Sequence, residues 1–304
     1  MVSHSEVSDL NFEKLFEFIK KKKFFIIGIT TLFFIISLSI SIIIPNTYKS
    51  TVLLTSSASS GNQLSSTSSG LAGLAGIGLG DVLGDNTKLE VGIEMMQSFN
   101  FFENFINKED NFFNLIAIKG WDKEKNILII DKNIYDEKNK KWVSNWKYAI
   151  NGKPSLQEAH EKFIDSFDAS LDISTGIVSV SFRHYSPYIS RNFVEKIVQE
   201  INKIARDEVI NTSQRQIEYL EIEMVNNQYS ELKQGISDLI EGQIEKISIA
   251  NASPDYLFRV ISKPYAPEKH DSPARIIIVI LSSIFSFMSS ILWIAFTKRK
   301  LIFS

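Results

Sequence analysis

The residues with the most obvious chemical potential form a glycine-rich stretch, SSGLAGLAGIGLGDVLG, over residues 68–84. Glycine-rich turns ahead of helices hold nucleotide phosphates, because their backbone N–H groups can approach an anion closely. This stretch lacks a G-K-[ST] signature, and its glycines are not phased as G-x-G-x-x-G between a strand and a helix. We therefore predict no nucleotide site here and interpret the stretch as a glycine-rich loop containing Gly73, Gly76, Gly78 and Gly80.

The other chemically capable side chains form no catalytic or metal-binding pattern. The histidines at positions 4, 160, 184 and 270 lie in unrelated contexts, and neither H-E-x-x-H nor G-x-S-x-G occurs. The chain has no cysteine, which removes thiol nucleophiles, cysteine-based zinc sites and disulfides. Its net charge of -2 gives no reason to expect nucleic-acid binding. We predict a protein that is not an enzyme and has no metal, no cofactor and no nucleic-acid or nucleotide partner.

Two uncharged, apolar segments, residues 24–44 and 276–296, set the topology of the chain. As helices, each would be roughly 31 Å long, which matches the hydrocarbon core of a bilayer. The first run is too long for the apolar part of a cleaved signal peptide, and no A-x-A-like site follows it. We predict two transmembrane helices with these bounds.

Basic residues are concentrated on one flank of each apolar segment, whereas the opposite flanks hold only Lys49 after the first segment and Lys263, Lys269 and Arg275 before the second. A run of lysines at 20–23 precedes the first segment, and a basic triplet at 298–300 follows the second. Because positively charged flanks tend to stay in the cytoplasm, we predict a cytoplasmic segment at 1–23 and a cytoplasmic tail at 297–304. Residues 45–275 would then form one domain outside the cytoplasm.

The outer domain shows both strand-like and helix-like patterns, which predicts an α+β fold. Alternating β-branched residues indicate strands, and apolar residues at helical spacing indicate amphipathic helices, one of them capped by a serine. The predicted elements are a strand at 47–57, a glycine-rich loop at 58–84, a helix from Asn86, a hairpin around 136–140, a helix capped by Ser155, a strand pair around Thr175-Gly176 and a final strand in DYLFRVIS.

The longest predicted element is a helical arm over about residues 187–250. It opens with Ser186-Pro187, where proline suits a first helical turn, and a bend is expected near Asn226-Asn227. An amphipathic arm of this length cannot bury its apolar stripe alone. The stripe could be covered by an intramolecular helical hairpin or by packing against neighbouring copies of the chain; the sequence favours neither over the other, and we expect both to contribute.

A proline-rich linker, KPYAPEKHDSPAR at residues 263–275, connects the outer domain to the second apolar segment. Proline fixes φ and lacks a backbone donor, so this segment cannot join the interior of a sheet or a helix. We interpret the linker as a stiff spacer that sets the distance between the domain and the membrane.

The linker and the span after it resemble the hallmark of Wzz-type chain-length determinants, also called polysaccharide co-polymerases. In that family, Pro, two residues, Pro, four residues and Ser-Pro precede a basic residue and two glycines four apart inside the span. Here Ala274 stands at the basic position with Arg275 beside it, and serines occupy both glycine positions. The residues of the proline motif are Pro264, Pro267, Ser272, Pro273 and Arg275.

Small residues in the two spans provide a candidate packing surface. In the second span, serines recur every four residues, and small side chains let membrane helices approach closely. The first span offers a candidate partner face. The packing residues that we predict are Gly28, Ser37 and Ser41 in the first span and Ser282, Ser286 and Ser290 in the second.

The resemblance extends over nearly the whole chain and implies an α+β domain at the membrane with a helical arm reaching outward. It implies a bacterial inner-membrane protein with a periplasmic domain that forms a ring-like homo-oligomer. It also implies a non-catalytic role in setting how many repeat units a Wzy-type polymerase adds to a lipid-linked glycan of O-antigen type. The lipid-linked glycan is a further candidate partner.

Two other functions stay open at this point. One is a capsule or exopolysaccharide export co-polymerase that works with an exporter or a separate kinase. The other is a membrane-anchored sensor, which would need a cytoplasmic output domain. In every case the apolar residues of the glycine-rich loop need cover, and we expect that loop to pack against a neighbouring subunit or the bilayer surface.

Overall fold

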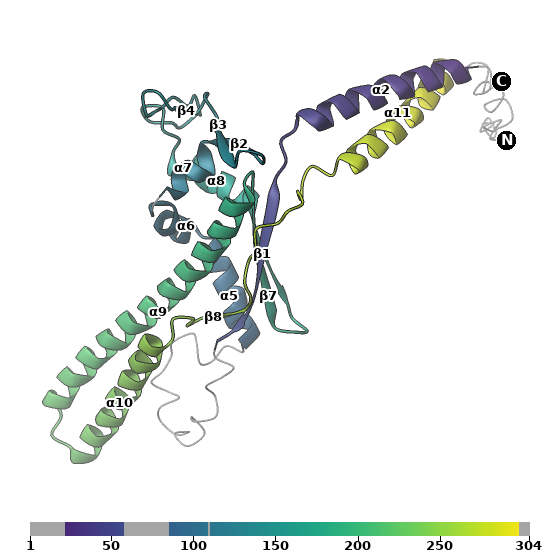
Figure 1. Ribbon diagram of the computed structural model, residues 1–304. Helices are drawn as coiled ribbons and strands as arrows, with labels where there is room; N and C mark the ends of the chain where they lie inside the picture. Colours follow the sequence, from purple (N-terminus) through teal and green to yellow (C-terminus); the bar gives the residue numbers. More distant parts are fainter. Residues whose placement is uncertain (1–21, 58–84, 109, 298–304) are drawn as a thin grey trace, which may run out of the picture. The chain divides into compact units, whose positions relative to one another are not determined.

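The computed structural model describes residues 22–57, 85–108 and 110–297 (Figure 1). The chain divides into two compact units, one formed by residues 1–46 with 271–304 and the other by residues 47–270. We call the first the helical unit, because it consists of two long helices, and the second the mixed unit, because it combines antiparallel strands with helices. The predicted α+β class is confirmed.

The helical unit is built from α2 (Lys23–Ile43) and α11 (Arg275–Thr297), which pack along one another. Both helices are long and apolar enough to cross a membrane. Only 17% of the most apolar window of each helix is buried, so most of these side chains face outward and do not form a protein core. A helix pair with this surface is suited to a hydrocarbon environment.

The mixed unit contains a four-stranded antiparallel sheet with the strand order β6-β7-β1-β8. Buried side chains alternate along β1, as expected when one face of a strand lies on the core. Val52 of β1 lies opposite Val180 of β7, and both are buried. The strands are β1 (Tyr48–Ser56), β6 (Phe167–Asp172), β7 (Ile177–His184) and β8 (Phe258–Ser262).

Helices pack against this sheet around a core that is rich in phenylalanine. The core helices are α5 (Asp85–Gln97), α6 (Phe99–Ile106), α8 (Leu156–Ser166) and the start of α9 (Pro187–Asn226). Two examples are the rings of Phe182 and Phe193, whose centroids are 4.9 Å apart, and those of Phe163 and Phe182, at 5.7 Å. Aromatic pairs at these distances are favourable beyond the area that they bury.

Serine side chains fix where two of these helices begin. Ser155 Oγ accepts the N–H of Glu158, whose carboxylate accepts the N–H of Ser155, so the predicted cap of α8 is confirmed. The helix predicted from Asn86 is interrupted, because Ser98 Oγ accepts the N–H of Phe101 and starts α6 there. A serine within a helical apolar pattern gives no clear signal for such a break.

The hairpin predicted around 136–140 was wrong in one of its strands. Short strands β4 (Tyr135–Asp136) and β5 (Lys141–Trp142) flank that turn. The apolar run before them, β3 (Ile127–Ile130), pairs instead with β2 (Ile118–Asp122). The carboxylate of Asp131 accepts a backbone N–H two residues further on, so a turn directly after β3 separates the two runs.

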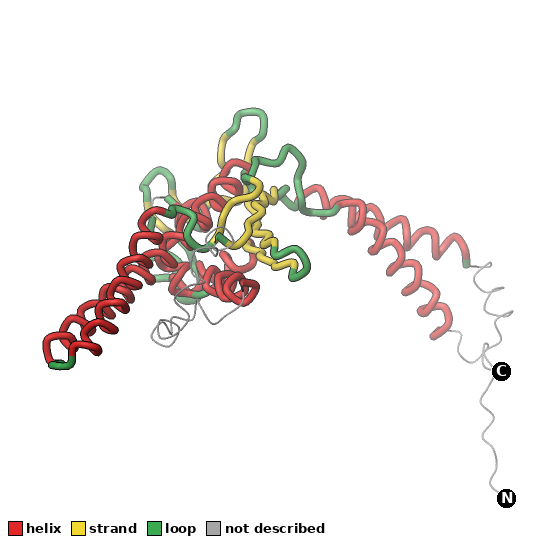
Figure 2. Tube along the Cα trace, turned by 90° about the horizontal axis from the view of Figure 1, so that it is seen from below, coloured by secondary structure: helices red, strands yellow, loops and turns green. Residues whose placement is uncertain are grey.

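The arm is a helical hairpin, formed by α9 and α10 (Ser230–Ala252) running side by side (Figures 1 and 2). The chain turns at residues 227–229, next to the expected bend. The hairpin covers part of the apolar stripe of each helix. Packing against neighbouring copies stays a prediction.

Candidate functional site

The boundary between the two units falls inside the proline-rich linker. Pro264 and Pro267 belong to the mixed unit, where both are half-buried. Ser272, Pro273 and Arg275 belong to the helical unit, where Pro273 is buried. The motif that the sequence singled out therefore connects the two units through the chain itself.

The mixed-unit part of the linker is held to β1 by Ser50. The hydroxyl of Ser50 donates to the carbonyl oxygen of Tyr265 at 2.8 Å. The backbone N–H of Ser50 donates to Ser190 Oγ at 2.9 Å, and Ser190 Oγ donates to the Phe182 carbonyl oxygen at 2.6 Å. Both serines are buried. This serine relay, Ser50 with Ser190, joins the linker, β1, β7 and the first turn of α9 at one point.

A second buried group holds the arm to the last strand. Asn202 of α9 accepts the N–H groups of Leu257 and Phe258 at 2.9 and 2.8 Å and donates to the Phe258 carbonyl oxygen at 2.8 Å. Its amide therefore satisfies three backbone groups at the start of β8. Sequence reasoning missed Ser50, Ser190 and Asn202, because nothing in a sequence distinguishes a buried polar residue from an exposed one.

In the helical unit, the last residue of the proline motif reaches the segment that follows α2. Arg275 donates from Nη2 to the side-chain oxygen of Asn46 at 2.9 Å, and its backbone N–H donates to the carbonyl oxygen of Pro273. The basic residue beside the family's basic position thus bridges the end of α2 and the start of α11.

The predicted packing residues of the spans divide into two groups. Ser37 and Ser290 donate to carbonyl oxygens of their own helices at 3.0 and 2.7 Å, so these hydroxyls need no partner across the pair. Ser282 is half-buried, whereas Gly28 is exposed, and a Cβ added at Gly28 would meet no atom. The structure brings together the other four as buried residues where α2 and α11 pack, namely Ser37, Ser41, Ser286 and Ser290.

His184 at the end of β7 holds the short helix α7 (Asn111–Ile116) next to the start of α9. Its Nε2 lies 2.9 Å from the carbonyl oxygen of Asn114, and its Nδ1 accepts the N–H of Ser186 at 3.0 Å. The ring is therefore neutral, with its proton on Nε2. Burial, with a smaller contribution from the charge of Lys162, lowers the pKa of His184 to about 4. This geometry fits a structural clamp.

The far end of the arm carries a group of exposed apolar side chains. They lie on both sides of the turn between α9 and α10, and the most exposed is Val225 at 82%. Such a surface is typical of a protein contact. These residues are Tyr219, Ile222, Val225, Tyr229 and Leu232.

Two further sequence predictions concern the glycine-rich loop and metal binding. The glycine-rich loop, with Gly73, Gly76, Gly78 and Gly80, lies outside the described residues. In the part of the chain that is described, no group of three or more histidine, aspartate or glutamate side chains could hold a metal ion.

Comparisons with known proteins point to one family. The family model for the Wzz chain length determinant protein matches residues 8–109. A solved full-length bacterial polysaccharide co-polymerase is similar at 11% identity, with 94% of this chain and 97% of that chain covered and a TM-score of 0.35. A fragment of WzzB, a polysaccharide co-polymerase from Salmonella Typhimurium, is similar at 11% identity, with 75% of this chain and 100% of that chain covered and a TM-score of 0.25. No curated protein matches this chain.

The family match and the proline motif lie in different parts of the chain. The match ends at residue 109, whereas the motif begins at Pro264. The resemblance to Wzz-type chain-length determinants, predicted mainly from the motif and the topology, is confirmed by a match that does not contain the motif.

Proposed function

We propose that this chain, which carries the Wzz family match, is an inner-membrane co-polymerase that sets the chain length of a lipid-linked surface polysaccharide of O-antigen type. The observation that carries the proposal is this match together with two apolar helices that flank an α+β unit. Both termini lie in the cytoplasm and residues 45–275 lie in the periplasm, as the basic flanks indicate. The chain acts as a ring-like homo-oligomer beside a Wzy-type polymerase and is not itself an enzyme.

A regulator without catalytic groups must act through its assembly and its contacts. The exposed apolar end of the arm supports assembly between copies. The serine relay supports a mechanical connection, because it ties the first turn of α9 to the carbonyl of Tyr265 in the linker. A change in how the arms pack would then reach the linker that leads to α11.

Deleting the gene and separating the extracted surface polysaccharide on a gel tests this function. We expect a changed length distribution that the wild-type gene restores. An unchanged distribution would overturn the proposal. A loss of surface polymer at unchanged length would favour the export co-polymerase instead.

Variants of the linker and of the second span test the mechanism. Pro267→Ala loosens the linker and Ser290→Leu blocks the close approach of α11 to α2, so both should shift the distribution at normal protein levels. Ser289→Leu is the matched control for Ser290→Leu, because Ser289 is exposed on the same helix. Equal effects of the two leucine variants would count against helix packing as the cause.

A further inference from the structure

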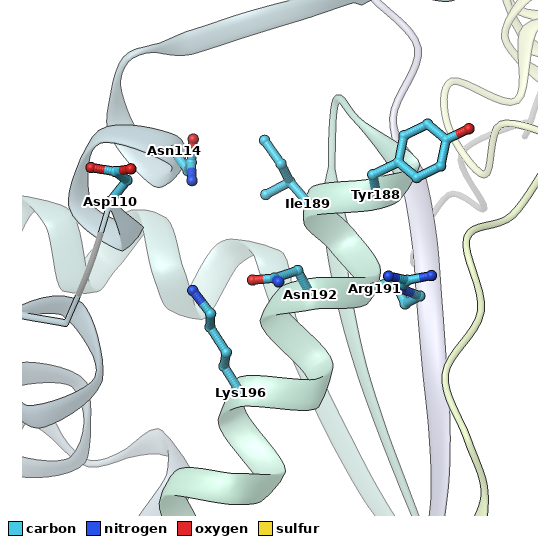
Figure 3. Close-up of a pocket in the computed structure, with 7 residues that line it drawn as sticks. All are labelled: Asp110, Asn114, Tyr188, Ile189, Arg191, Asn192 and Lys196. Atoms are coloured by element: carbon cyan, nitrogen blue, oxygen red, sulfur yellow. The ribbon is translucent and has the colours of Figure 1, made fainter. Parts of the chain in front are cut away.

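An open hollow of about 350 Å³ lies between α7 and the first turns of α9 (Figure 3). Its volume is at the lower end of the range for ligand pockets. The side chains of Asp110 and Asn114 face those of Asn192 and Lys196 across the hollow. This hollow plays no part in the serine relay or in the contacts between the two apolar helices.

The two walls of the hollow are fixed by hydrogen bonds behind them. His184 binds the carbonyl of Asn114 on one side and the backbone of Ser186 on the other. Lys196 Nζ donates to Asn111 Oδ1 at 3.1 Å, and the amide of Asn111 donates in turn to the Phe105 carbonyl oxygen at 2.8 Å. The chain's own hydrogen bonds therefore hold both walls of the hollow in place, which lowers the entropic cost of binding.

The side chains that face the hollow have unused hydrogen-bonding capacity. Within the described residues, the side chains of Asp110, Asn114 and Asn192 make no hydrogen bond, although the backbone of Asp110 and Asn114 does. Each asparagine amide offers donors and an acceptor, and the carboxylate offers acceptors only. These donors and acceptors match the hydroxyl groups of a ligand, because a hydroxyl group both donates and accepts hydrogen bonds.

The charges that face each other across the hollow are opposite, and the third charged residue of its lining, Arg191, is paired with the carboxylate of Glu195 at 3.7 Å. Asp110 and Lys196 carry opposite charges on opposite sides of the hollow. A phosphate or carboxylate ligand would meet the carboxylate of Asp110 as well as the ammonium group of Lys196, and like charges repel. A neutral, polyhydroxylated ligand meets no such penalty.

We propose that this hollow binds an uncharged segment of a polysaccharide. The inference rests on the proposed function and names the surface through which the chain contacts its glycan. A glycan bound in the hollow would lie next to the serine relay. Ser190 of that relay lies on α9 between Ile189 and Asn192, which line the hollow. A glycan that orders these turns acts on the point where the arm meets the linker.

Binding to the full chain in lipid nanodiscs tests the proposal. The probe is lipid-free polysaccharide released by mild acid from cells of the source strain, with inorganic phosphate as a second probe. Replacing both asparagines (Asn114→Ala with Asn192→Ala) removes two hydrogen-bonding groups and should raise the Kd for the polysaccharide about 10-fold or more. Gln234→Ala is the control, because its exposed amide lies on α10, away from the hollow, and donates to Asp238 of the same helix.

The outcomes separate this proposal from the proposed function. Equal affinity of the double variant and the wild type would overturn the hollow as a glycan site, as would phosphate binding that the same variant abolishes. If gene deletion changes polysaccharide length while the double variant binds and regulates normally, the site is wrong and the function stands. If deletion changes nothing, the function is wrong, and a loss of polysaccharide binding in the double variant would still support the site.

Discussion

The two halves of α9 share one continuous helix and have opposite surroundings. In the near half, up to Asn202, side chains such as Phe193 and Ile197 are fully buried in the core of the mixed unit. In the far half, Ser213 alone among the described side chains is classed as buried, and Ile222 is 60% exposed. The same helix is thus a core element at one end and a projecting arm at the other.

This difference implies two levels of stability within one helix. The near half is stabilised by tertiary packing, which supplies most of the stability of protein helices. Among the described residues, the far half packs against α10, and pairs within the helix such as Lys203 and Asp207, 3.2 Å apart, add local contacts. Regions with few buried contacts open locally at a lower free energy than the core. We therefore expect the far half to exchange its amide hydrogens much earlier than the near half.

The largest effect should come from emptying the core at the near half. The ring of Phe193 lies 4.9 Å from that of Phe182 and 5.5 Å from that of Phe105. Phe193→Ala should lower the free energy of unfolding by about 3–5 kcal/mol, because it leaves a cavity. Ile222→Ala in the far half should change it by about 0.5 kcal/mol or less.

The free energy of unfolding of Phe193→Ala and Ile222→Ala can be measured by urea unfolding of the full chain in detergent, followed by tryptophan fluorescence. Trp121, Trp142 and Trp146 lie in the mixed unit and report on its unfolding. If Ile222→Ala cost as much as Phe193→Ala, the arm and the core would unfold as one unit, and the comparison between the halves would fail.

Acid should weaken the near half through His184. Its pKa is about 4 in the folded chain, against an ordinary value of 6.5, so between these values the unfolded chain binds a proton that the folded chain does not. The free energy of unfolding should fall by about 3 kcal/mol as the pH drops from 7 to 4. His184→Gln should remove most of that slope, as seen in urea unfolding at a series of pH values. The far half contains no histidine and should not show it.

The sequence could predict the elements but not the polar contacts that join them. The apolar spans, the arm and the Ser155 cap follow from local patterns that need no partner. Ser50 and Ser190 meet across 140 positions of the chain, and no local pattern encodes that contact. For the same reason, no local pattern indicates that His184 is buried between α7 and the start of α9.

Gly28 illustrates a different limit, which lies in helix geometry. It stands nine residues before Ser37, which is about two and a half turns, so the two residues lie on opposite faces of α2. The structure accordingly buries Ser37 and Ser41 and leaves Gly28 exposed. The small size of these residues suggested a single packing face, but the helical repeat places Gly28 on the opposite face from Ser37 and Ser41.

Hydrogen bonds should also contribute more to the free energy of unfolding in the near half of α9 than in the far half. Asn202→Ala removes three hydrogen bonds to the start of β8 and should cost about 2–3 kcal/mol in urea unfolding, because it leaves buried backbone groups unpaired. Ser213→Ala removes one bond to Gln243, 3.1 Å long, and should cost about 1 kcal/mol. The second loss should appear as faster hydrogen exchange in α10, with the unfolding of the core around the sheet unchanged. A larger loss of stability for Ser213→Ala than for Asn202→Ala would contradict the conclusion that the near half is the more stable of the two.

Two glycine substitutions should have effects of opposite sign, because the glycines lie in helices with different surroundings. A Cβ at Gly92 of α5 would lie 2.6 Å from Cζ of the fully buried Phe258, so Gly92→Ala should destabilise the mixed unit by about 1–3 kcal/mol. A Cβ at Gly235 of α10 would meet no atom, so Gly235→Ala should stabilise the arm by about 0.5–1 kcal/mol through helix propensity. Hydrogen exchange in α10 measures the gain. If Gly235→Ala slows exchange in the arm and also shifts polysaccharide length, the space beside Gly235 is filled by a neighbouring copy in the assembled protein. An unchanged length would place that contact elsewhere on the arm.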